Sequence, residues 1–167
     1  KKTLEYFNST DKKDIDILVN CGKFLHCTLL DTSTVLNHWL YCIHFDKTRP
    51  EPYVNIIELL LADKFVFTQN LNEINQLLEA GLSYNLNDYI FIGTLARFYE
   101  YQEEHEKAIN YYFRALKIAP NNPQLLHNTG LIIAKSQNRP DDCEKYFKKA
   151  LAANDNLPYI YKSLIKY

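Results

Sequence analysis

The chain has 167 residues, of which 47% are hydrophobic and only 4 are glycine, and its formal net charge is −1. A chain of this length can bury a sizeable core, so one domain covering residues 1–167 is expected. No apolar run reaches membrane length and no signal-peptide pattern opens the chain, which argues against a membrane protein and favours a cytoplasmic location. A pI near 6.6, without a basic stripe carrying interleaved aromatics, argues against nucleic-acid binding.

The first predicted helical hairpin covers about residues 15–54. Apolar and small residues recur at helical spacing in two runs, namely Leu18, Cys21, Gly22 and Leu25, then Val35, Trp39 and Cys42. The next hairpin, about residues 55–88, shows the same features more weakly in Leu61, Ala62 and Phe65, then Ile74, Leu78 and Gly81. Because the interval from Gly22 to Ala62 is longer than that from Ala62 to Ala96, we expect a longer connection between these hairpins, through residues 47–52.

Residues 89–122 give the clearest hairpin. Two helix faces are predicted, one from Ile92, Leu95, Ala96 and Tyr99, and one from Ala108, Tyr112 and Ala115. A polar turn over residues 101–106 separates them, and the prolines at 120 and 123 end the second helix. Such a hairpin cannot bury its apolar face alone, so neighbouring hairpins must stack on it.

The pattern continues downstream. Ala62, Ala96 and Gly130 are equally spaced, and the hairpin at about residues 123–157 carries Leu126, Gly130 and Ile133, then Cys143, Phe147 and Ala150. The second set follows its counterpart by slightly more than this spacing, so an extra residue is expected within 136–140. Residues 158–167 begin another first helix, with Tyr161 and Leu164 in phase.

The repeating pattern is a large residue, Leu, a small residue and Tyr, then Ala, an aromatic and Ala, then Pro. It resembles the tetratricopeptide repeat, a helix–turn–helix unit with a period of about 34 residues. The resemblance is clear over about residues 89–156 and degenerate over 15–88, with Thr129 and Asp155 departing from it in the fourth hairpin. It implies an all-α fold in which antiparallel helical hairpins stack as a right-handed superhelix. The first helix of each hairpin would then line a concave groove.

We expect this groove to bind a protein or peptide partner. The candidates are the residues that the packing pattern leaves over on the first helices, most of which are polar or charged: Arg97, Tyr101, Gln124, His127, Asn128, Leu131, Lys135, Lys162 and Lys166. Their cations and amides favour an acidic or extended peptide. Residues 1–88 hold 8 Lys+Arg and 12 Asp+Glu, giving −4, whereas residues 89–167 hold 11 and 8, giving +3. Solvated faces explain this asymmetry, although it could also steer a partner.

One binding mode of the family is rejected on the residues. Co-chaperone repeat domains hold a terminal carboxylate with two lysines, two asparagines and a further cation, and only Asn128 matches that set. Gly93 and Tyr159 stand where the lysines would be, Arg97 where the other asparagine would be, and Ser163 where the last cation would be.

Catalytic, cofactor and metal sites are not predicted. No phosphate-binding loop, metal-ligand helix motif or nucleophile elbow is present, so we expect no enzyme activity and no cofactor. His38 and Cys42, on one helix face and near His44, could face a zinc ion with Cys21 or His26. Core packing of Cys42 beside Trp39 is the simpler interpretation.

Two functions therefore stay open: a scaffold that binds a partner in its groove, or a helical-repeat appendage of an enzyme such as a glycosyltransferase, serving to recognise its protein substrate. The absence of methionine, including at position 1, suggests a piece of a longer protein. The last helix has apolar residues on two faces, Tyr161, Leu164 and Ile165, so we expect either further residues or a second copy of the chain to cover it.

Overall fold

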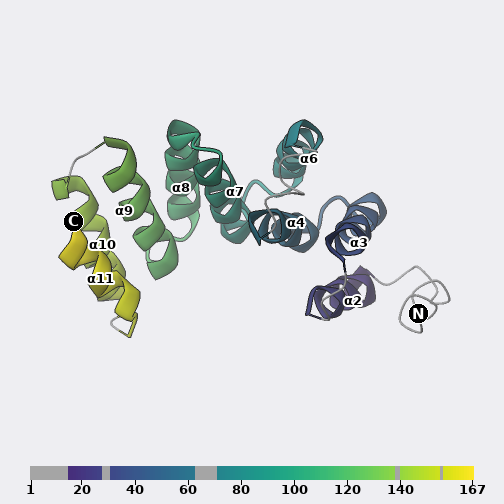
Figure 1. The fold of residues 1–167 in the computed structure, drawn as a ribbon, viewed down its shortest axis with the longest axis horizontal. Coiled ribbons are helices and arrows are strands. Elements are labelled where there is room, and N and C mark those ends of the chain that lie inside the picture. Colours follow the sequence, from purple (N-terminus) through teal and green to yellow (C-terminus); the bar gives the residue numbers. More distant parts are fainter. Residues whose placement is uncertain (1–14, 28–30, 63–70, 138–139, 155) are drawn as a thin grey trace. The chain divides into compact units, whose positions relative to one another are not determined.

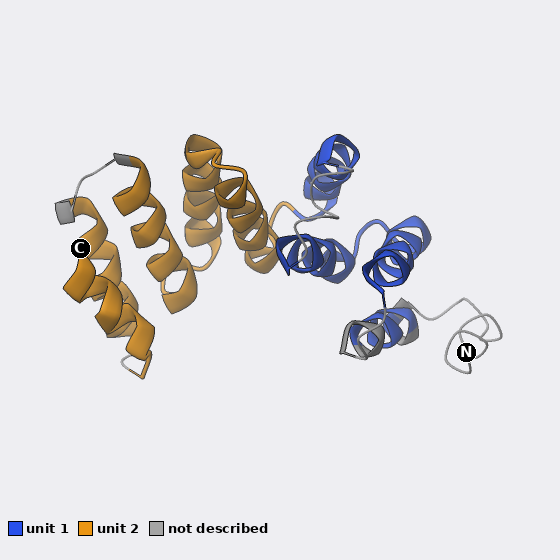
Figure 2. Cartoon of the chain, in the orientation of Figure 1, with its two compact units in different colours: residues 1–85 blue, residues 86–167 orange. Residues whose placement is uncertain are grey.

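The computed structural model describes residues 15–27, 31–62, 71–137, 140–154 and 156–167. Over these ranges the secondary structure is α-helical (Figure 1). The helices are α2 (Ile15–Cys27), α3 (Thr32–Phe45), α4 (Pro50–Ala62), α6 (Leu71–Tyr84), α7 (Tyr89–Tyr101), α8 (His105–Ile118), α9 (Pro123–Gln137), α10 (Pro140–Ala153) and α11 (Pro158–Lys166). They form two compact units, residues 1–85 and 86–167 (Figure 2). The single domain over residues 1–167 stays a prediction.

In unit 1, α2 and α3 pack as the predicted hairpin. A Cβ placed on Gly22 would lie 2.5 Å from Cη2 of Trp39, so only glycine lets the two helices approach this closely. Trp39 and Cys42 are fully buried, as their spacing predicts. The guanidinium of Arg49 pairs with Asp16 at 2.7 Å and thereby ties the start of α4 to α2.

The predicted position of the second hairpin is wrong in its first helix. The spacing places Leu61, Ala62 and Phe65 on the packing face, but α4 ends at Ala62, which is exposed, and Phe65 lies outside the described residues. The buried residues are instead Pro52, Tyr53, Ile56, Ile57, Leu59 and Leu60. The buried residues of α4 and the corresponding buried residues of α7 are therefore separated along the sequence by more than one repeat length.

The prolines explain this difference. The spacing predicts a long connection through residues 47–52. Proline is accepted in the first turn of a helix, however, because the N–H that it lacks has no partner there. Pro50 accordingly begins α4, and the connection from α3 covers only residues 46–49. The longer interval lies after α4. In α6, Ile74, Leu78 and Gly81 are buried as predicted, one full repeat before their counterparts in α8.

In unit 2, α7 and α8 confirm the clearest hairpin. All the residues predicted for its two packing faces are buried. The turn falls at residues 102–104, where Glu103 adopts a left-handed φ of 63° that reverses the chain. Glu106 lies in the first turn of α8, where the partial positive charge of the helix N-terminus favours an acidic side chain.

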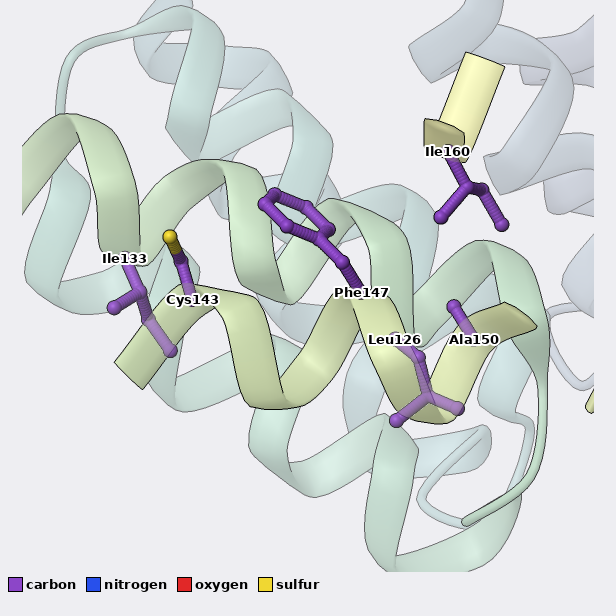
Figure 3. Packing of buried hydrophobic residues seen from close by; sticks show 6 residues of the cluster. All are labelled: Leu126, Ile133, Cys143, Phe147, Ala150 and Ile160. Atoms are coloured by element: carbon purple, nitrogen blue, oxygen red, sulfur yellow. The ribbon is translucent and has the colours of Figure 1, made fainter. Parts of the chain in front are cut away.

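The second half of unit 2 is built around Phe147. This ring lies in a buried cluster with residues from α9, α10 and α11, namely Leu126, Ile133, Cys143, Ala150 and Ile160 (Figure 3). A Cβ on Gly130 would lie 2.5 Å from the ring, so the glycine again permits the helix contact. Thr129 stands where the family has leucine, and it is fully buried. Its hydroxyl can be buried because it donates a hydrogen bond to the carbonyl of Leu125 at 2.7 Å.

The last helix is rotated relative to the prediction. The spacing predicts that Tyr161 and Leu164 pack inward, but Ile160 is the fully buried residue of α11. Leu164 is half-buried against the Phe147 cluster, and Tyr161 is 48% exposed. Because successive residues of a helix are about 100° apart around its axis, a shift of one position moves a different side chain into the core.

Candidate functional site

A pocket of about 220 Å³ lies between α7 and α9, the first helices of two successive hairpins of unit 2. It brings together three of the predicted groove residues, Arg97, Gln124 and Asn128. Its complete lining is Tyr89, Ile90, Gly93, Thr94, Arg97, Asn122, Gln124, Leu125 and Asn128. Arg97 is the one side chain in this lining that carries a charge at neutral pH.

Gly93 in the lining faces the side chain of Leu125. A Cβ on Gly93 would lie 2.6 Å from the terminal methyl Cδ2 of Leu125 and at least 3.9 Å from other atoms, so a methyl group fits there if the Leu125 side chain moves. Thr94, the next residue, turns its hydroxyl to the carbonyl of Ile90 at 2.8 Å. The Thr94 hydroxyl is therefore used within α7, and Ile90 and Leu125 supply apolar atoms to the lining.

The polar residues of the lining on α9 are fixed by hydrogen bonds. Gln124 Nε2 donates to Asn128 Oδ1 at 3.0 Å, and Tyr159 on α11 donates its hydroxyl to Gln124 Oε1 at 2.8 Å. Asn122 Oδ1 accepts from the backbone N–H of Leu125 at 3.0 Å and caps the start of α9. These bonds hold the amide side chains in place, and side chains fixed in this way lose less entropy on contact with a ligand.

Lys135 also lies on α9, but the carboxylate of Glu100 neutralises its charge. Its Nζ is 2.6 Å from Glu100 Oε1 on α7, and the hydroxyl of Tyr112 donates to the other carboxylate oxygen at 3.1 Å. Burial, followed by the charge of Glu100, raises the pKa of Tyr112 well above its usual value, so the phenol stays a neutral donor. The prediction did not include Glu100. Its separation from Lys135 along the chain, close to one repeat, was the signal that could have indicated the pair.

His127 is also less available than predicted. Its side chain is only 6% exposed, since its ring packs edge-on against Tyr159 at a centroid distance of 4.8 Å and beside Phe147 at 5.7 Å. Nε2 lies 2.9 Å from the hydroxyl of Ser163 on α11. Burial lowers the pKa of His127, so the ring is neutral at pH 7. His127 therefore positions α11 against α9 in this structure.

The other predicted groove residues are placed as follows. Tyr101 is half-buried at the end of α7, and Leu131 is half-buried against the Phe147 cluster. Lys162 is exposed on α11, with Ser163 and Leu164 beside it half-buried. Lys166 is exposed at the end of the same helix, and its ammonium lies 5.0 Å from the centre of the Tyr167 ring. The pocket lining includes none of these four predicted residues.

The histidine and cysteine pair of unit 1 is explained by packing. His38 Nε2 lies 2.9 Å from the carbonyl of Leu18, and Cys42 Sγ is 3.5 Å from the same nitrogen. Burial raises the pKa of the Cys42 thiol to about 12, which disfavours the thiolate that zinc requires. Among the described residues no group of three or more His, Cys, Asp or Glu side chains could hold a metal ion. The side chain of His26 lies outside the described residues.

Within the described ranges, no helix is both long and apolar enough to cross a membrane.

Comparison with known proteins supports the repeat assignment. Residues 91–122 match the family model of the tetratricopeptide repeat. No curated protein sequence matches the chain significantly. Solved structures do resemble it: TTC0263, a thermophilic TPR protein of Thermus thermophilus, has 14% identity and a TM-score of 0.77 over 93% of this chain and 82% of that one. PilF of Pseudomonas aeruginosa has 14% identity and a TM-score of 0.74 over 90% and 65%.

A third similar structure is that of MamA from Desulfovibrio magneticus RS-1, with 13% identity and a TM-score of 0.68 over 93% of this chain and 82% of that one. At these identities the likeness shows the fold alone. It confirms the predicted all-α fold of antiparallel helical hairpins. Residues 91–122 are therefore a tetratricopeptide repeat, and the chain as a whole shares the fold of the tetratricopeptide repeat proteins that it resembles.

Proposed function

We propose that the chain is a protein-interaction scaffold, and that the face of unit 2 carried by α7, α9 and α11 binds an extended segment of a partner protein. The pocket between α7 and α9 is the observation that carries this proposal. Helices of successive repeats line it, which is the arrangement that repeat proteins use to form extended binding surfaces.

The charges of this face favour an acidic partner. Arg97 lines the pocket, and Lys162 and Lys166 are exposed on α11. Lys135 contributes less than the sequence suggested, because Glu100 already neutralises it. A partner that pairs with Arg97 gains charge-assisted hydrogen bonds, which are stronger than neutral ones.

An array of short peptides with acetylated and amidated ends tests the proposal with the whole chain. We expect bound peptides to lose affinity on Arg97→Glu and on Asn128→Ala, because both side chains line the pocket. Lys117→Glu is the matched control, since Lys117 is exposed on α8 and does not line it. Binding that both groove variants leave unchanged would place the binding site elsewhere on the chain.

The groove would serve equally in a free-standing scaffold or in the substrate-recognition appendage of an enzyme. Reading the flanking sequence of the full gene for a catalytic domain separates these two settings. A cytoplasmic location and the absence of enzyme activity stay predictions.

Self-association is a second proposal, and it is favoured by the last helix. Ile165 is 86% exposed and Tyr161, one turn earlier, is 48% exposed. An apolar pair on one helix face is stabilised when a second copy covers it. The oligomeric state of the chain, measured by light scattering over a concentration series, tests this proposal.

A further inference from the structure

We infer that the pocket between α7 and α9 is an anchor site for one apolar side chain of the partner, flanked by an acidic residue that pairs with Arg97. This inference rests on the proposed function and defines the class of segment that the groove would accept. It follows from the size of the pocket, the chemistry of its wall and the charge in its lining.

The size of the pocket limits the ligand. Clefts that hold drug-sized molecules and cofactors usually have volumes of about 300–1,000 Å³. This pocket, at about 220 Å³, is smaller. It therefore suits one or two side chains of a peptide better than a whole small-molecule cofactor.

The wall of the pocket is apolar. Ile90 contributes a side chain that is 53% exposed, and Leu125 contributes its methyl groups from the opposite helix. Gly93 adds no side chain, and the hydroxyl of Thr94 already donates to the backbone. An apolar side chain that enters would remove the exposed surface of Ile90 from water, which is favourable.

The polar side chains of the lining differ in the groups that they offer to a ligand. The carbonyl oxygens of the Gln124 and Asn128 amides accept hydrogen bonds from within the chain, so they are poorly placed to select a ligand. Arg97 carries N–H donors in a planar fork that matches a carboxylate. No carboxylate belongs to the pocket lining, so an acidic side chain next to the apolar anchor would meet no repulsion there.

Substituted peptides test the inference. The probe is the tightest peptide from the array, resynthesised with a fluorophore and with single replacements, and read by fluorescence anisotropy. Replacing the apolar anchor by Ala should weaken binding by about tenfold or more, because burial of a leucine-sized side chain is lost. Replacing the neighbouring acidic residue by Lys should also weaken binding, since it brings a like charge to Arg97.

Two variants of pocket residues, each with a matched control, test whether the pocket causes the preferences for an apolar anchor and for an acidic neighbour. Ile90→Glu should abolish the preference for an apolar anchor over Ala. Ile118→Glu, which changes another exposed isoleucine, this one on α8, should not. Arg97→Met should abolish the preference for Glu over Gln and keep the preference for the apolar anchor. Arg114→Met is the control for this loss of charge, because Arg114 packs over Tyr111 outside the pocket lining. Circular dichroism confirms that each variant is folded.

The outcomes separate this inference from the proposed function. If peptides bind and respond to Asn128→Ala, but tolerate Ala at every apolar position or ignore Ile90→Glu, the anchor is refuted while the groove stands. If the acidic neighbour is exchanged for Lys without loss, the role of Arg97 is refuted. If no peptide binds, or if Arg97→Glu and Asn128→Ala both have no effect, the proposed function fails and the inference fails with it.

Discussion

Gly130→Ala is the substitution that tests the described packing of unit 2 most directly. Gly130 lies in the middle of α9, and an added Cβ would lie 2.5 Å from Cε1 and 2.9 Å from Cδ1 of Phe147. Favourable carbon–carbon contacts lie at about 3.5–4.0 Å, so one of the two side chains must move.

Two opposing effects set the magnitude. Alanine is favoured over glycine inside a helix by about 1 kcal/mol. Overpacking a well-packed core costs about 1–3 kcal/mol. Phe147 is fully buried among Ile133, Cys143 and Ile160, so its ring has no space to turn into and the cost should fall in the upper part of that range. We therefore expect Gly130→Ala to destabilise unit 2 by about 1 kcal/mol net.

Gly93→Ala is the matched control. Its Cβ would meet a terminal methyl of Leu125 at 2.6 Å, but this methyl belongs to a flexible side chain that borders the pocket and can move into it. We expect this variant to be neutral or slightly stabilising, because the helix preference of alanine is then not offset.

The assay is urea denaturation followed by far-UV circular dichroism, with hydrogen exchange of the α9 amides. The single tryptophan, Trp39, belongs to unit 1, so its fluorescence is not a local probe of this substitution. Phe147→Leu added to Gly130→Ala should recover about 1 kcal/mol relative to the sum of the single changes, since the smaller side chain relieves the overlap. A Gly130→Ala variant more stable than the parent, or full additivity in this cycle, would refute the described contact of α9 with α10.

Further outcomes follow from individual residues. Ala115→Trp should cost about 1–3 kcal/mol or more in urea denaturation, because Ala115 is fully buried. Glu103→Gly should raise the urea midpoint, with a gain of up to about 1 kcal/mol, since glycine adopts the left-handed φ of 63° without strain. Burial lowers the pKa of His127 below 6.5, so as the pH falls through 6.5 the unfolded chain binds the proton first and stability should decrease. His127→Gln should reduce that decrease between about pH 7.5 and about pH 5.5. Ile165→Glu should make the chain monomeric in light scattering if α11 mediates self-association, and an unchanged mass distribution would contradict this.

Local spacing alone was enough to predict much of the fold. Ile92, Leu95 and Ala96 fall on one helix face, and Tyr112 and Ala115 fall on the next, because the helical period of about 3.6 residues fixes which side chains share a side. The turn between them and the proline stop are equally local features. For these reasons the hairpin at residues 89–122 and the buried face of α10 could be predicted from the sequence.

Contacts between helices determine two features that local spacing does not specify, namely where α4 begins and which face of α11 is buried. Pro50 and Pro52 are compatible with either a linker or a first helical turn, and the burial of Pro52 and Tyr53 selects the helix. In α11 the residues 160 and 161 are both apolar, so only docking against Phe147 determines that Ile160 turns inward.

The candidate site depended on tertiary structure most strongly. Three of the residues that the first-helix pattern predicts, Arg97, Gln124 and Asn128, line one pocket, and their role in binding stays a prediction. It could not show that Glu100 pairs with Lys135, because that contact depends on how α7 and α9 pack. Nor could it show that His127 is buried beneath α11. A sequence pattern specifies which face of a helix a residue occupies, whereas the charge and space at that face depend on the neighbouring helix.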